Sequence, residues 1–256
     1  MAKKHPIEMM ALIDPSLYGR LKALRAQMLD DRIGKPAKVL VPVGARPAMG
    51  DRPVPRVLFV GKATRGWTEK KLDSFDGSRS LAEDVVRDLL PTGGTAFWQF
   101  VREVLRQTLH FCKIEARDTE LPSFCGWSNL VKIGETCRGY APPGDESLDR
   151  QKALCIEALR MEITLFRPTA VVLTTQDYAK HEIVFPLFGE DNGRWRFDTP
   201  QHDSVSFKFH DDLKTTVIWT NHPQGMRPPG TRVRVQTLVA DLIRRATQGR
   251  SLPRSA

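Results

Sequence analysis

The sequence has no long hydrophobic segment and no closely paired cysteines. Its longest apolar stretches, such as residues 170–175, are far shorter than the roughly 18–20 residues of a membrane-spanning helix. Residues 1–6 have no apolar segment behind them, so we expect neither a targeting segment nor a membrane partner. The four cysteines include no Cys-x-x-Cys pair, which is typical of reduced core thiols in a cytoplasmic protein.

The sequence also lacks the glycine-rich phosphate loops of nucleotide-binding enzymes. Neither G-x-G-x-x-G nor G-x-x-x-x-G-K-[ST] occurs, so an unrelated nucleotide-processing enzyme is the least favoured function. No internal repeat or low-complexity run is present. With 41% hydrophobic and 27% charged residues in 256, the composition is that of a globular protein long enough to fill a substantial core.

What the chain has in excess is positive charge. It carries 39 Lys and Arg against 30 Asp and Glu, and residues 214–256 contain eight basic residues and one acidic residue, Asp241. Basic ends are often only solvated surfaces. They are also what a protein needs to neutralise phosphates and release counterions, so we expect DNA as the partner of a monomeric protein.

Apolar strand patterns alternate with amphipathic helix patterns along the chain. The four expected strands lie within residues 56–61, 126–131, 170–175 and 215–220. This order predicts an α/β fold with three layers, α/β/α, around a central four-stranded parallel sheet. We expect residues 1–55 to form an N-terminal helix and a basic extended arm, residues 56–248 the α/β domain, and residues 249–256 a flexible tail.

Polar and small residues follow three of these strands. They are Gly61-Lys-Ala-Thr-Arg-Gly-Trp67, Asn129-Leu-Val-Lys132 and Asn221-His-Pro-Gln-Gly-Met-Arg227. In parallel sheets, ligands bind outside the carboxyl ends of the strands. The three segments together resemble the uracil-DNA glycosylase superfamily over roughly residues 56–245, and family-four enzymes most. The resemblance implies an enzyme that flips a damaged or modified pyrimidine out of DNA and hydrolyses its glycosidic bond, leaving an abasic site.

The resemblance assigns roles to residues that would surround the base. His222 would donate a hydrogen bond to the base O2 as negative charge develops. Asn129 would read the base edge with its donor and acceptor, Gly61 would leave room for the base, and Phe75 would stack on it. Without the resemblance, His222 is interpreted as a turn residue, Asn129 as the cap of a strand end, and Phe75 as a core residue.

Other residues would contact the DNA around the flipped nucleotide. Met226 corresponds to the apolar wedge of the relatives, and Arg227 beside it would hold a flanking phosphate. We expect Gln224 and Arg232 to contact DNA as well. Gly225 and the following Pro-Pro-Gly also fit an ordinary exposed turn.

The first strand-end segment departs from the family pattern. Relatives carry Asp, Asn or Glu where this chain has Lys62 and Ala63. A carboxylate from elsewhere, a water held by Asn221 or the backbone, or Lys62 acting as an amine nucleophile would each restore a mechanism. The nearest carboxylates along the chain are Asp73, Asp76 and Glu135. We prefer a carboxylate and include Asp76 and Lys62 among the expected catalytic residues.

The same segment bears on the substrate. It lacks the aromatic ring that closes the pocket beside C5 in uracil-specific relatives, so a bulky C5-modified pyrimidine would fit. Arg65, Lys62 and Gln224 would supply donors to an appendage such as the sugar of glucosylated hydroxymethylcytosine in phage DNA, which implies anti-phage defence. The alternative function is a catalytically inactive protein of this fold that binds DNA or modified bases.

Family-four enzymes hold an iron–sulfur cluster on four cysteines. Cys155 falls near one of those positions, but Ile133 occupies another and the N-terminal cysteine pair is missing. Because a cluster needs all its thiolates, we expect neither a metal nor another cofactor.

Overall fold

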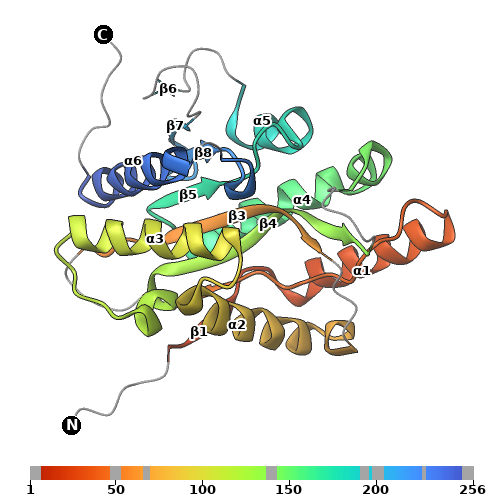
Figure 1. Cartoon of the computed structure of the whole chain (residues 1–256). Helices are drawn as coiled ribbons and strands as arrows, with labels where there is room; N and C mark the ends of the chain where they lie inside the picture. Colours follow the sequence, from red (N-terminus) through yellow and green to blue (C-terminus); the bar gives the residue numbers. More distant parts are fainter. Residues whose placement is uncertain are drawn as a thin grey trace.

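The protein is built around one mixed sheet. The computed structural model of the chain describes residues 7–46, 53–65, 70–136, 143–190, 196–197, 205–226 and 229–249. Eight strands pair in the order β1-β2-β4-β3-β5-β8-β7-β6 (Figure 1). In chain order they are β1 (Met9–Ala11), β2 (Val43–Ala45), β3 (Val57–Arg65), β4 (Cys125–Glu135), β5 (Ala170–Leu173), β6 (Arg196–Phe197), β7 (Val205–His210) and β8 (Thr215–Thr220).

The α/β class expected from the sequence is confirmed, but the sheet is larger and of mixed direction. Strands β4, β3, β5 and β8 pair in parallel, at the four positions where strand patterns were found. The outer strands β1, β2, β7 and β6 all pair in antiparallel fashion. The four expected parallel strands thus form the centre of a larger sheet, which antiparallel strands extend at both edges.

Helices cover both faces of the sheet. They are α1 (Pro15–Asp30), α2 (Phe75–Thr92), α3 (Ala96–Phe111), α4 (Asp145–Phe166), α5 (Phe185–Phe188) and α6 (Pro229–Thr247). Val57 and Phe59 of β3 pack in the core formed with α2, α3 and α6, whereas Leu58 and Val60 pack on the opposite side with α4 and α5 (Figure 1). Successive strand side chains point to opposite faces, so both faces of β3 are buried.

The N-terminal region is part of this architecture and not an arm outside it. Strand β2 pairs with β4, and α1 packs in a third cluster that includes Ile133 of β4. The Ser78 hydroxyl accepts from the Val41 amide at 2.7 Å and donates to the Val39 carbonyl at 3.1 Å, which ties residues 39–41 to α2. These contacts form because the outer edge of β4 would otherwise expose unpaired backbone groups.

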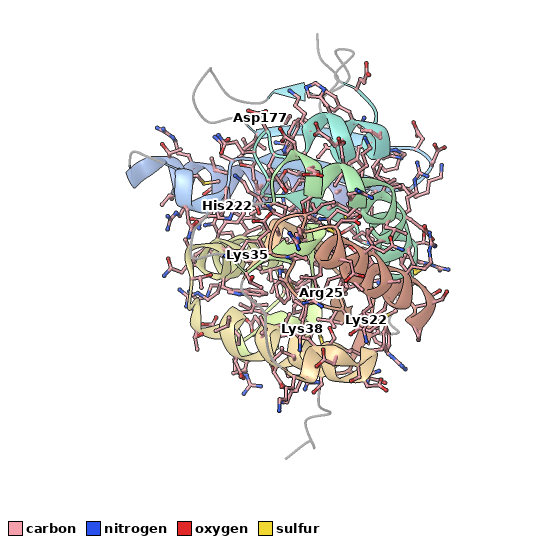
Figure 2. All side chains as sticks on the ribbon, turned by 90° about the vertical axis from the view of Figure 1, so that its right-hand side faces the viewer. Lys22, Arg25, Lys35, Lys38, Asp177 and His222 are labelled. Atoms are coloured by element: carbon pink, nitrogen blue, oxygen red, sulfur yellow. The ribbon has the colours of Figure 1, made fainter. Side chains whose placement is uncertain are left out.

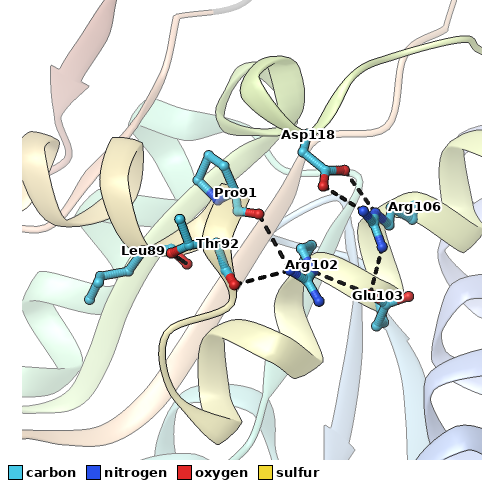
Figure 3. Close-up of polar contacts among 7 residues, drawn as sticks. All are labelled: Leu89, Pro91, Thr92, Arg102, Glu103, Arg106 and Asp118. Carbon is cyan, nitrogen blue, oxygen red and sulfur yellow. Dashed lines mark hydrogen bonds and ion pairs between the residues drawn. The ribbon is translucent and has the colours of Figure 1, made fainter.

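A polar network fixes the connection between α2 and α3. Arg102 Nη1 donates to the carbonyl oxygens of Pro91 and Thr92 at 3.4 and 3.1 Å, and Arg106 pairs with Glu103 and Asp118 (Figure 3). Carbonyls in the last turn of a helix lack partners within that helix, so a guanidinium at this end satisfies them. The network thus sets where α3 begins, near the ends of the parallel strands.

Some sequence-based expectations lie outside the described residues. They concern Cys137, one of the four cysteines, and residues 250–256 of the expected tail. None of the helices in the described ranges has the length and apolar character that crossing a bilayer demands.

Candidate functional site

Gly61 and Asn129 lie side by side where two parallel strands approach their carboxyl ends. They are register partners of β3 and β4. A Cβ atom on Gly61 would lie 2.8 Å from Asn129 Oδ1 and 3.8 Å from Phe97 Cε2. Real Cβ contacts are essentially never this short, so a side chain at position 61 would displace the amide. Glycine here leaves room for the Asn129 side chain and, beside it, for the ring of Phe97 at the start of α3.

The Asn129 amide is available to a ligand. The residue is 8% exposed, and its side-chain amide makes no hydrogen bond to another residue of the described part of the chain. Asn129 lines a small hollow, with room for about one water molecule, together with Trp127, Leu40, Pro42 and other residues of β4. Its donor and acceptor have no partner among the described residues, so they are available to a polar ligand.

A buried ion pair holds the backbone behind Asn129. Lys132 Nζ lies 2.6 Å from Glu162 Oε1 and donates to Ser128 Oγ at 2.7 Å and to the Asn129 carbonyl at 2.5 Å. The two charged side chains are 2% and 0% exposed. Burial raises the pKa of Glu162, and the Lys132 ammonium opposes that effect. The strand is thereby fixed at Asn129; Glu162, on α4, was not found from the sequence.

His222 follows β8 at the same edge of the sheet. Its Nδ1 accepts from the Gln224 backbone amide at 3.4 Å, so in the neutral ring the proton resides on Nε2. The imidazole is partly buried; desolvation, with a smaller contribution from the Lys62 charge, lowers its pKa to about 4. His222 is therefore a neutral hydrogen-bond donor at pH 7. Arg232 Nη2 donates to the Pro223 carbonyl at 2.9 Å and holds this loop on α6.

A chain of contacts links the loop after β8, which carries His222, to the hollow at Asn129. The 3-10 turn at Pro223–Gly225 contacts α3, and α3 carries Phe97, which lies near Gly61. Lys62 follows Gly61 and is electrostatically coupled to both His222 and Asp177. The structure thus places the three strand-end segments of the sequence at one edge of the sheet.

Asp177 is a carboxylate that sequence reasoning missed. It follows β5, and its side chain is 80% exposed and 3.9 Å from Lys180. Burial lowers the pKa of Lys62, and the Asp177 charge opposes this. The signal was present in the sequence, because Asp177 stands just past the third parallel strand, the one strand end that supplied no candidate. Asp76, by contrast, is exposed in the first turn of α2, and Asp73 pairs with Lys38.

Phe75 lies elsewhere than expected. Its ring packs edge-to-face against Tyr18 of α1, with centroids 5.7 Å apart, and it belongs to the cluster around α1. It is not among the residues that line the Asn129 hollow. The aromatic rings near Asn129 are Trp127 and Phe97, neither of which the sequence spacing singled out.

Met226 does not have the exposure that a DNA wedge requires. It is 5% exposed and packs in the core shared with α3 and α6, because its thioether fills space beneath the loop. Gln224 and Gly225 are the exposed residues of this loop. Arg227 and the side chain of Arg65 lie outside the described part of the structure.

Four basic residues line the face of the molecule on which His222 lies. Lys22, Arg25, Lys35 and Lys38, here called the basic strip, are labelled with His222 and Asp177 in Figure 2. Lys22 donates to the Asp73 carbonyl and Arg25 to the carbonyls of residues 36 and 37, while Lys35 is exposed. Lys38 Nζ pairs with the Asp73 carboxylate at 2.9 Å.

The pKa of His222 gives a direct test of this geometry. In an NMR titration we expect the His222 ring to protonate with a midpoint near pH 4. The unfolded imidazole titrates at about 6.5, so protonation opposes folding and the free energy of unfolding should decrease as the pH falls from about 6.5 to 4. Lys62→Met should raise the midpoint by removing a repulsive charge, and Lys214→Asn, in the turn before β8, should not. A wild-type midpoint near 6.5 would contradict the desolvated placement.

Comparison with models of known protein families finds no match for the chain, and comparison with curated proteins finds none either.

Proposed function

We propose that the protein is a DNA N-glycosylase that releases a pyrimidine from DNA and leaves an abasic site. The observation that carries the proposal is the placement of a free amide, Asn129 within β4, and a neutral imidazole, His222 just past β8, toward the carboxyl ends of parallel strands of one sheet. Gly61 keeps the space beside the amide open. The same three segments carry the resemblance to the uracil-DNA glycosylase superfamily, which supports this reaction over others.

Each side chain has a role that its chemistry suits. The Asn129 amide reads the donor and acceptor on the edge of an extruded pyrimidine. The His222 Nε2–H donates to the base O2, where negative charge develops as the glycosidic bond breaks. A neutral donor is suited to this task because it needs no proton loss or gain at pH 7. Trp127 and Phe97 supply the aromatic surfaces nearest the amide, in place of Phe75.

Hydrolysis also needs a group that orients water and tolerates a positively charged sugar. We infer that Asp177 fills this role, since it is the carboxylate coupled to Lys62 at the ends of the parallel strands. A carboxylate at this place favours the oxocarbenium-like sugar and accepts a proton from the attacking water. Its exposure leaves it accessible to DNA bound across the strand ends.

DNA fits the charge of the protein. The basic strip lies on the face that carries His222 (Figure 2), so phosphates on one side of the flipped nucleotide have a cationic surface to follow. We propose uracil or a bulky C5-modified base, such as glucosylated hydroxymethylcytosine, as the substrate, with anti-phage defence as the setting.

The test is base release from defined oligonucleotides. Single- and double-stranded DNA carrying one uracil, 5-hydroxymethyluracil, 5-hydroxymethylcytosine, its glucosylated form or plain cytosine is incubated with the protein and then treated with alkali. We expect strand cuts at one or more of the modified positions and none at plain cytosine. Tight binding of the same DNA without any base release would support the alternative, a non-catalytic protein that recognises DNA or modified bases.

A further inference from the structure

Lys62 is a nucleophilic group at the candidate site to which the proposed base release gives no task. It follows Gly61 on β3 and is partly buried. Within the described residues, no hydrogen bond or ion pair holds its ammonium group. Most lysines place their charge in water or against a carboxylate, so an unpaired lysine at a strand end is poorly explained by stability alone.

The surroundings of Lys62 favour the neutral amine. Desolvation lowers its pKa, and the charge of Asp177 only partly offsets this. Lys62 lies two residues past Val60, where β3 pairs with the last residue of β5, and His222 lies three residues past Trp219, which pairs with that same residue, so both belong to the same end of neighbouring parallel strands. A donor to the base O2 lies close to the sugar carbon C1′, because O2 is attached to the ring atom adjacent to the glycosidic nitrogen. A nucleotide held by that donor would thus present C1′ to the strand ends that carry Lys62.

We propose that Lys62 forms an imine with C1′ of an abasic site and cleaves the DNA strand on its 3′ side, a lyase activity beyond hydrolysis. The inference rests on the proposed function for the source of the abasic site. The substrate class is the ring-opened deoxyribose aldehyde in DNA, whichever process generated it.

The reaction balances without an oxidant or a metal. The amine nitrogen adds to the C1′ aldehyde, and the resulting carbinolamine loses water to give a protonated imine. The imine acidifies the C2′ hydrogen, and the Asp177 carboxylate accepts that proton. The C2′–H electrons form the C2′–C3′ double bond, while the C3′–O3′ bond breaks and the phosphate leaves with its electron pair. Water then hydrolyses the imine, returning Lys62 and releasing an unsaturated aldehyde.

The test starts from DNA in which the abasic site is already present, so base release by this protein is not needed. The protein is mixed with the abasic duplex in the presence of sodium cyanoborohydride, which reduces an imine to a stable amine. We expect a covalent protein–DNA complex, and peptide mass mapping should place the adduct on Lys62. Without the reductant, the strand should be cut before any alkali is added.

Variants separate Lys62 from the many other lysines of a basic protein. Lys62→Ala and Lys62→Arg should each lose at least about tenfold in trapping and cutting, since an arginine keeps the charge but not the nucleophilic amine. Lys214→Asn removes an exposed lysine in the turn before β8 and should trap like the wild type. DNA binding by fluorescence anisotropy and thermal unfolding confirm that each variant is folded and competent to bind.

Three outcomes would overturn the inference: undiminished trapping by Lys62→Ala, an adduct on another residue, or no trapping by wild type that binds the abasic duplex. Trapping at Lys62 in a protein that releases no base would contradict the proposed function and leave the lyase inference standing. Base release without trapping would support the proposed function and contradict the lyase inference.

Discussion

His222→Ala is expected to slow base release about 10²- to 10³-fold, the usual effect of removing one preorganised donor to a developing anion. The neutral ring offers Nε2–H because Nδ1 accepts from the Gln224 amide. Without that donor, the departing pyrimidine is stabilised only by the remaining contacts. DNA binding should change little, because the basic strip and the Asn129 hollow remain. Single-turnover release from the best substrate of the oligonucleotide panel measures the rate.

The controls distinguish chemistry from folding. His110→Ala replaces an exposed histidine in the last turn of α3 and should keep the wild-type rate. His222→Gln retains a side-chain N–H and should recover part of the loss. Losing the Nδ1 acceptor of the Gln224 amide should lower the free energy of unfolding at pH 7 by about 1 kcal/mol, which leaves the protein folded. A His222→Ala protein that is stable, binds DNA and releases base at the wild-type rate would refute the assigned role.

Lys132→Met is expected to lower the free energy of unfolding by about 3–5 kcal/mol, because it leaves the fully buried Glu162 carboxylate without its partner. The Ser128 hydroxyl and Asn129 carbonyl also lose a donor. Chemical denaturation at pH 7 measures the change. The double variant Lys132→Met/Glu162→Leu removes both charges and should recover most of the stability, since a buried pair adds little over an apolar replacement.

The pH dependence of the single variant supplies a further check. Burial raises the pKa of Glu162, and without Lys132 only the Ser128 hydrogen bond opposes that effect. A carboxyl whose folded pKa exceeds its unfolded value binds more protons in the folded state, so the variant should regain stability as the pH falls toward that of the unfolded group, about 4.3. A loss below about 1 kcal/mol, or a loss independent of pH, would contradict the buried ion pair.

The roles assigned to Phe75 and Met226 show that spacing along the sequence was not enough to predict where a side chain packs. Phe75 was expected to stack on the base, yet it packs on Tyr18 of α1. Met226 stands at the place of a wedge, yet it is buried against α3 and α6. Spacing along the chain fixes how far a residue can reach, but not which neighbour covers it. In both cases the side chain packs in a core against an element that is distant in the sequence.

The sequence by itself determined the alternation of strands and helices and the positions of the four parallel strands, although β3 and β4 continue to Arg65 and Glu135, beyond the ends that the sequence predicted. It could do so because hydrophobic periodicity is local, and because parallel strands must bring their carboxyl ends to one edge of a sheet. Only the tertiary structure decided that β1 and β2 extend the sheet, that Glu162 pairs with Lys132, and that Asp177 is coupled to Lys62. These depend on burial and on contacts between residues far apart in the chain, which no local pattern encodes.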